Sequence, residues 1–270
     1  MRSSTQRVVL NYIYTFFLAL ILAYSPASLA RQAAQLSSTG VVPSAAQIER
    51  DEIYGLLAYA VVRKDWQTDQ TEPRRGHNIG SVLVDPDGNV VFWARNANAI
   101  TKNGSQHGEV RLIRNYLENH EGSYLKGYTV YTSLEPCAMC SGMMTLTQVT
   151  RTVYGQTDLD YGKALERLQL DSHSFTQPNG FEPYPRPVIS DVLDSDIRRR
   201  IDTAYAAYQQ SGGKGLTTWL RSDEAKGLYD SAFKAFNTYK VKHRENDAVL
   251  RKARDYYKKV VSADYVPLPQ

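Results

Sequence analysis

Hydrophobic residues recur every three or four positions in several stretches of the chain, which is typical of helices that bury one face. The first stretch begins at Gln47, carries Ile53, Leu57 and Val61, and predicts a helix to about Lys64. The same spacing predicts further helices over residues 108–119, 136–146, 162–169, 195–210, 222–239 and 247–261.

Short runs rich in β-branched and aromatic residues predict strands over residues 79–84, 90–94, 129–133, 152–154 and 188–190. The turn residues Asp85-Pro86-Asp87-Gly88 join the first two strands as a hairpin. Because a helix joins the last two strands, those strands should run parallel. The pattern predicts an α/β fold with three layers, α-β-α, around a mixed five-stranded sheet, followed by a C-terminal helical extension.

The pattern divides the chain into a main domain over residues 46–210 and a helical extension over residues 211–270. A small, polar stretch over residues 31–45 is interpreted as a linker. The two helices of the extension cannot bury their apolar faces alone. They should dock on the main domain or form the contact of a homodimer. Residues 171–187 form a loop with four prolines, which is either functional or a plain surface excursion.

The N-terminus is typical of a signal peptide over residues 1–30. Arg2 and Arg7 precede an apolar run over residues 12–24, and Ser28-Leu29-Ala30 supplies the small residues of a cleavage site. The apolar run is shorter than the roughly 20 residues that a membrane span needs. We expect cleavage after Ala30, no stable span thereafter, and a periplasmic or secreted protein. An uncleaved anchor is the alternative.

The chain has 270 residues, of which 42% are hydrophobic and 22% charged, as in a globular protein. Its formal net charge of +4 falls to about +2 without the two signal arginines. From Ser231 onward, nine Lys or Arg residues stand against four Asp or Glu residues. This tail is therefore a candidate for nucleic acid binding, whereas the main domain has no comparable excess.

The candidate chemistry lies in His107-Gly108-Glu109 and in Pro136-Cys137-Ala138-Met139-Cys140. His107, Cys137 and Cys140 offer an imidazole and two thiolates, the ligands of a zinc site whose fourth position is open for catalysis. A closed structural site would need a fourth ligand, and the chain has only two cysteines. Cys-x-x-Cys alone is also typical of a redox pair, but that pair needs no His-x-Glu upstream.

Glu109 is left over as a carboxylate that the metal does not need. One zinc ion per chain would lower the pKa of a bound water toward roughly 7. Glu109 can then take the proton of this water and pass it to the substrate. We expect His107 and Cys137 each to stand at the start of a helix, where the helix dipole favours anions.

The run Thr132-Ser133-Leu134-Glu135-Pro136-Cys137-Ala138-Met139-Cys140-Ser141-Gly142, with Val153-Tyr154-Gly155 and Asp158 after it, resembles the zinc-dependent cytidine/deoxycytidylate deaminase-like superfamily. The similar branch includes tRNA adenosine deaminases, guanine deaminases and yeast-type cytosine deaminases. The resemblance spans residues 79–210 and implies a cytidine deaminase-like fold. It also implies that Asn96 binds substrate, with Asn98 as a competitor. Gly108 stands where the family usually has alanine.

Three functions follow for testing. The first is hydrolytic deamination of a nucleobase or nucleoside, with guanine or adenine types favoured, in which the zinc-activated water attacks the amino-bearing ring carbon. The second is an exported deaminase of RNA or single-stranded DNA, either editing-like or a toxin, that uses its basic tail to hold the backbone. The third is a non-catalytic protein that zinc stabilises for binding. A purely structural site gives Glu109 no purpose.

Overall fold

The computed structural model describes residues 43–173, 175 and 178–262. The predicted signal peptide and most of the predicted linker lie outside the described residues. The elements are α3 (Ala45–Arg63), β1 (Gly80–Val84), β2 (Val90–Arg95), α4 (Gly108–Asn119), β3 (Thr129–Thr132), α5 (Ala138–Leu146), β4 (Arg151–Tyr154), α6 (Ala164–Leu168), β5 (Ile189–Val192), α7 (Asp196–Gln210), α8 (Leu216–Trp219), α9 (Asp223–Thr238), η1 (Arg244–Asn246), α10 (Asp247–Tyr256) and η2 (Tyr257–Val261).

The five strands form one mixed sheet in the order β2-β1-β3-β4-β5. β1 runs antiparallel to both β2 and β3, whereas β3, β4 and β5 run parallel. This confirms the predicted mixed five-stranded sheet and its parallel last strands. Ser81 of β1 stands opposite Thr132 of β3, and Thr132 is in register with Tyr154 of β4.

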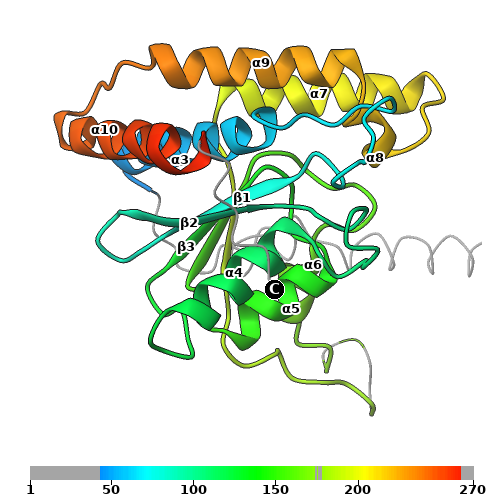
Figure 1. Cartoon of the computed structure of the whole chain (residues 1–270). Coiled ribbons are helices and arrows are strands. Elements are labelled where there is room, and N and C mark those ends of the chain that lie inside the picture. Colours follow the sequence, from blue (N-terminus) through cyan, green and yellow to red (C-terminus); the bar gives the residue numbers. More distant parts are fainter. Residues whose placement is uncertain (1–42, 174, 176–177, 263–270) are drawn as a thin grey trace, which may run out of the picture. The chain divides into compact units, whose positions relative to one another are not determined.

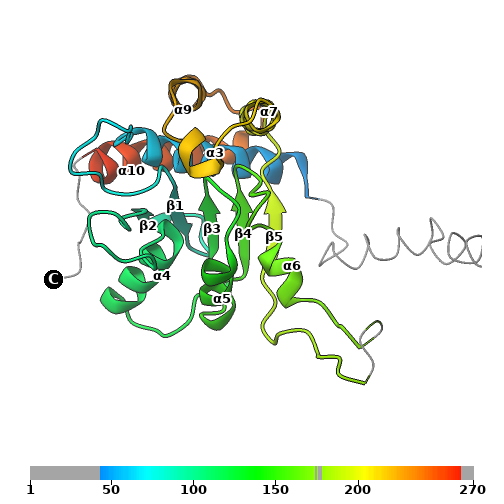
Figure 2. The same ribbon diagram turned by 90° about the vertical axis from the view of Figure 1, so that its right-hand side faces the viewer.

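Helices cover both faces of the sheet (Figures 1 and 2). α4, α5 and α6 lie on one face, which we call the metal face. α3 and α10 lie on the other, the extension face, with α7 and α9 outside them. Side chains alternate along each strand, so that Val82 joins the hydrophobic cluster of the extension face and Leu83 that of the metal face. The sheet therefore separates two cores.

α3 is buried on nearly every side, although its sequence predicted only one apolar face. The side chain of Ser44 caps its first turn by accepting a hydrogen bond from Gln47 N. Ile53, Leu57 and Val61 are fully buried, because the sheet covers one side of the helix while α9 and α10 cover the other. The helix is thus the centre of the extension-face core.

The extension docks on α3 through both apolar and polar contacts. Tyr229 and Phe236 of α9 are fully buried in the cluster that contains α3. The carboxylate of Glu49 accepts hydrogen bonds from the backbone N–H groups of Lys242 and His243, at 2.5 and 3.0 Å. Of the two alternatives for the apolar faces, the structure thus shows docking. Where the main domain ends, at residue 210 or elsewhere, stays a prediction.

One basic residue of the extension is used inside the fold. The Arg254 guanidinium donates to the carbonyl oxygens of Phe236, Asn237 and Tyr239 at 2.8–3.1 Å. These carbonyls end α9, where helical carbonyls have no partner within the helix. The positive charge of Arg254 therefore caps a helix.

Two features differ from the predicted elements. The short helix α8 was not predicted, and the last predicted helix, over residues 247–261, ends in the π-helical turn η2. In the proline-containing loop, Phe175, Phe181 and Tyr184 are exposed, so these aromatic rings add little to either core. Within the described residues, none of the helices combines the length and the apolar character that crossing a bilayer requires.

Candidate active site

The three predicted metal ligands meet at the starts of two helices on the metal face. His107 is the residue before α4, Cys137 is the residue before α5, and Cys140 lies in the first turn of α5. His107 Nδ1 lies 3.6 Å from each sulfur, and the two sulfur atoms are 3.6 Å apart. About thirty positions separate His107 from the two cysteines in the sequence, and the fold brings them together.

These distances fit a tetrahedral zinc ion. With Zn–S bonds of about 2.3 Å and a Zn–N bond of about 2.0 Å, the two sulfurs are about 3.8 Å apart and each lies about 3.5 Å from the nitrogen. His107, Cys137 and Cys140 thus have the donor types and the spacing for zinc. They supply three of its four ligands.

Hydrogen bonds among the three ligands shift their pKa values. The hydrogen bond between the sulfur atoms of Cys137 and Cys140 lowers the pKa of Cys137 to about 4. The same bond and burial raise the pKa of Cys140 well above its ordinary value. The hydrogen bond to Cys137 raises the pKa of His107. A divalent cation would replace the shared protons with metal-ligand bonds.

Glu109 lies beside the three ligands, in the first turn of α4. Its side chain is 3% exposed, and burial raises the pKa of its carboxyl. Glu109 Oε1 accepts a hydrogen bond from Thr132 Oγ1 at 2.9 Å, and Oε2 lies 3.5 Å from Cys140 Sγ. Thr132 ends β3, so the sheet itself fixes the orientation of the carboxylate. The role of Glu109 as proton carrier stays a prediction.

Asn96 has a structural role that the sequence did not reveal. It directly follows β2 and is fully buried, and its Oδ1 accepts a hydrogen bond from Gly108 N at 2.6 Å. Asn96 therefore holds the start of α4. Its Nδ2 has no hydrogen-bond partner among the described residues, but Asn96 does not line the pocket described below. Its predicted contact with substrate stays a prediction, as does that of its competitor Asn98.

A Cβ added to Gly108 would lie 3.4 Å from Asn96 Oδ1 and from the carbonyl oxygen of Ala94. That is the near limit of ordinary contact. The site thus has just enough room for the alanine that the resemblance leads one to expect. Gly108 itself is not required by the space around it.

The metal ligands and Glu109 line a pocket of about 660 Å³. This volume is in the range of small-molecule sites. Three more carboxylates, those of Glu135, Asp158 and Asp160, belong to residues that line it, as does the imidazole of His77. Residues 215–217 of the extension complete the wall. Among the described residues that line the pocket, none is a lysine or an arginine.

The acidic residues also organise the loop after β4. Glu135 accepts hydrogen bonds from the backbone N–H groups of Asp158 and Lys163, and Asp158 accepts them from Asp160 and Tyr161. Burial raises the pKa of both Glu135 and Asp158. Glu135 and Asp158 lie in the motif that carried the resemblance. His77 and residues 215–217 gave no such signal.

The arrangement of the sheet, the helix starts and the ligand set defines a zinc-dependent deaminase. Residues 57–156 match the family described as the cytidine and deoxycytidylate deaminase zinc-binding region. The chain belongs to this family, whose members use zinc, and it is a hydrolase. The match ends before Asp158 and well before the extension.

Several curated relatives are named tRNA-specific adenosine deaminase. The chain is 32% identical over 128 residues to the tRNA-specific adenosine deaminase of Haemophilus influenzae, covering 47% of this chain and 70% of the relative. It is 25% identical over 122 residues to the enzyme of that name from Aquifex aeolicus, covering 45% and 80%. Against a Streptococcus pyogenes relative, it is 33% identical over 93 residues and covers 34% and 57%.

The chain is also similar to solved structures. One, from a study of A-to-I editing by tRNA:A34 deaminases, is 27% identical, with a TM-score of 0.37 over 51% of this chain and 95% of the other. The guanine deaminase of Bacillus subtilis is 17% identical, with a TM-score of 0.36 over 62% and 98%.

Proposed function

We propose that this protein hydrolytically deaminates a free nucleobase or nucleoside, with a purine favoured. The main support for this proposal is the charge of the pocket. Glu109, Glu135, Asp158 and Asp160 line it, and no lysine or arginine does among the described residues. A phosphate group would meet carboxylates there without a lysine or arginine of the described lining to pair with. A neutral planar base, with or without a sugar, meets no such penalty.

In the mechanism, zinc held by His107, Cys137 and Cys140 would supply the Lewis acid that makes water nucleophilic near neutral pH. Glu109 takes a proton as the water oxygen bonds to the amino-bearing carbon. It then delivers that proton to the substrate, so that the carbon–nitrogen bond breaks and ammonia leaves. Thr132 keeps Oε1 of Glu109 occupied, which leaves Oε2 for the pocket side.

The preference for a purine rests on the relatives. The Haemophilus influenzae and Aquifex aeolicus proteins are both named adenosine deaminases, and adenosine carries a purine with an exocyclic amino group. The sequence covers 70% and 80% of these relatives. The extension lies outside the family match at residues 57–156 and makes one wall of the pocket. The relatives thus support a purine substrate. Whether the purine binds as a free base or as a nucleoside depends on the part of the pocket wall that the extension forms.

A substrate panel tests the proposal. Zinc-loaded protein is given adenine, guanine, cytosine and their nucleosides, and ammonia release is measured together with the metal content. We expect turnover of at least one purine substrate and its loss in Glu109→Ala, which should keep its zinc because Glu109 is not a ligand. Metal-replete protein that releases no ammonia from any member of the panel would refute the proposal.

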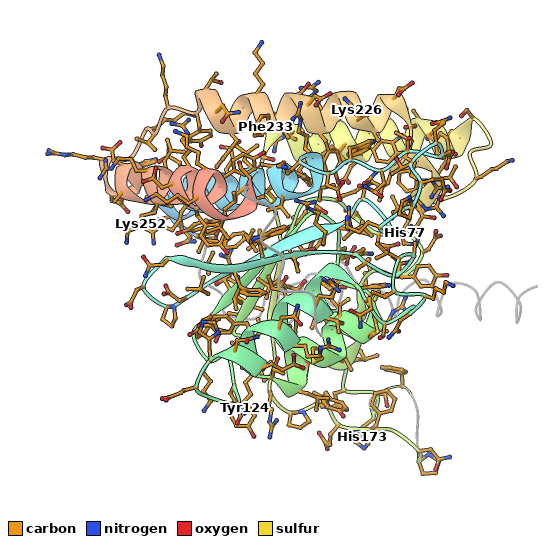
Figure 3. All side chains as sticks on the ribbon, in the orientation of Figure 1. His77, Tyr124, His173, Lys226, Phe233 and Lys252 are labelled. Carbon is orange, nitrogen blue, oxygen red and sulfur yellow. The ribbon has the colours of Figure 1, made fainter. Side chains whose placement is uncertain are left out.

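Deamination of RNA or single-stranded DNA is the second candidate, because the curated relatives are named for tRNA. The placement of the basic tail does not favour it. Lys252 donates to Asn89 Oδ1 in the β1–β2 turn, and Figure 3 shows Lys252 and the pocket residue His77 at opposite ends of the view. Single-stranded oligonucleotides containing adenine, tested at low and high salt beside the free bases, distinguish the candidates.

The third candidate, a non-catalytic zinc-stabilised protein, gives a different result in the same panel. It predicts no ammonia release from any substrate. It also predicts that Glu109→Ala changes nothing that can be measured, because only the three ligands would matter for stability.

Assembly and export are separate proposals. Large apolar side chains at the surface, such as Leu146, Leu159 and Tyr161, support a homodimer, which sedimentation of the purified protein would detect. The signal-like residues 1–30 support export to the periplasm or the medium. N-terminal sequencing of the exported protein should then begin at Arg31, and a start at Met1 would remove this support.

A further inference from the structure

The chain returns to the catalytic pocket at a point far from the metal ligands in sequence. After α7, Gly215, Leu216 and Thr217 line the same pocket as His107 and Cys137. Leu216 is 7% exposed and packs in the core, whereas Thr217 is exposed at the pocket. All three lie outside the family match at residues 57–156. This part of the wall therefore lies outside the region that matches the family.

The segment is held in place from both sides. Trp219 is fully buried, with its ring centroid 5.3 Å from that of Tyr205 in α7. The carbonyl oxygen of Leu220 accepts a hydrogen bond at 2.8 Å from Nδ2 of Asn78, which is itself fully buried. Arg221 donates to the carbonyl oxygen of Thr217 at 2.7 Å. These contacts fix residues 215–217 against the loop before β1.

His77 belongs to that same loop and also lines the pocket. The structure gives its imidazole no hydrogen-bond partner among the described residues. Burial, followed by the positive charges of Arg221 and His107, lowers the pKa of His77 to about 4. At neutral pH the ring is uncharged, so one nitrogen donates and the other accepts. A neutral imidazole can therefore form hydrogen bonds with polar atoms on the edge of a base.

We propose that His77 and residues 215–217 form the specificity wall of the pocket. Leu216 and Thr217 limit the size of any group attached to the base, and His77 hydrogen-bonds to the base itself. The inference rests on the proposed function, since it concerns how a base or nucleoside is selected. It assigns a role to the extension that needs no contact with nucleic acid.

Narrowing the pocket tests the size limit. Thr217→Trp places a large ring at an exposed position, where folding should tolerate it. We expect at least a tenfold loss of kcat/KM for nucleosides and a smaller loss for the free base. The matched control is Lys214→Trp, which adds the same ring at an exposed residue of the same loop that does not line the pocket. It should behave as the wild type.

Removing the imidazole tests the hydrogen bond. His77→Ala should raise KM roughly fivefold with a smaller change in kcat, because one hydrogen bond to substrate is worth about 1 kcal/mol. His77→Gln should recover part of the loss, since its amide also offers a donor and an acceptor. Circular dichroism melts of each variant identify any that fail to fold.

Binding of hypoxanthine by calorimetry separates this inference from the proposed function, because this purine has no amino group to lose. Should the wild type bind hypoxanthine but release no ammonia from any substrate, the proposed function fails. Weaker hypoxanthine binding in His77→Ala would then still support the wall. Folded Thr217→Trp and His77→Ala proteins that match the wild type in KM and in hypoxanthine binding would overturn the inference.

Discussion

The two faces of the sheet are built by different means. On the metal face, the four reactive side chains come from residues 107–140 and are placed by two helix starts and one strand end. On the extension face, contacts join residues almost 200 positions apart, such as Glu49 with His243 and Arg50 with Asn246. Local spacing therefore specifies the chemistry, whereas long-range packing specifies much of the stability.

Glu109→Gln is the sharpest test of the metal face. The amide keeps the size of the side chain and can still accept from Thr132, but it cannot take a proton. We expect about 10²–10⁴ less ammonia release, with zinc content unchanged. The control is Glu118→Gln at the exposed end of α4, which should be neutral. Near-normal turnover in Glu109→Gln would show that another group carries the proton.

Phe236→Ala should have the largest effect on the extension face. Phe236 is fully buried, and its ring centroid lies 6.0 Å from that of Tyr257. Removing the ring leaves a cavity and should lower the free energy of unfolding by about 3–5 kcal/mol in chemical denaturation. Phe181→Ala, at an exposed ring, serves as the control. Equal effects of the two substitutions would mean that α9 does not belong to the core.

Thr132→Val tests whether the hydrogen bond from Thr132 to Glu109 contributes to catalysis. Valine replaces the hydroxyl that donates to Glu109 Oε1 with a methyl group of similar size. We expect kcat to fall about tenfold with KM nearly unchanged, and Thr132→Ser to restore it. Thr152→Val removes a buried hydroxyl that bonds to the Val130 carbonyl instead. A loss of the same size in Thr152→Val would point to general damage to the sheet.

Glu49→Gln should give the smallest effect, and only in acid. Burial raises the pKa of Glu49, but hydrogen bonds from Lys242, Asn246 and His243 outweigh it, so the folded-state pKa is lowered. The carboxylate therefore adds stability above its unfolded value, about 4.3, which is lost as pH falls through the lowered folded-state pKa.

Chemical denaturation at pH 7 and below pH 4 measures this loss. The wild type should lose more stability between the two pH values than Glu49→Gln does. Glu245→Gln, whose side chain is 63% exposed, should follow the wild type. An unchanged acid loss in Glu49→Gln would remove Glu49 as an anchor of the extension.

The same contrast explains what could be predicted from the sequence. The metal ligands were predictable because zinc restricts both residue type and spacing, and the sheet was predictable because its strands are short β-branched runs between helices. The structure brings His107, Cys137 and Cys140 together, and the roles of Glu109 and Asn96 remain predictions. The fold itself, with its parallel last strands, is confirmed.

Other parts of the site carried no readable pattern. α8 has four residues, which is too short to show a helical period. The bond from Thr132 to Glu109 depends on which face of β3 the threonine occupies, and a one-residue change of register would reverse it. Amphipathic spacing in the extension indicated a buried face, but nothing in it named α3 as the partner. A role for His77 could be inferred only from the structure, which places it in the pocket lining.

Leu216 and Thr217 stand more than seventy positions beyond Cys140 along the chain, yet they share its pocket. A polypeptide shortened before residue 215 would keep every zinc-coordinating atom and lose one side of the cavity. One metal ion per chain in a purified fragment therefore does not show that the fragment is catalytically active. Preparations are better judged by whether the C-terminal helices remain attached and ordered.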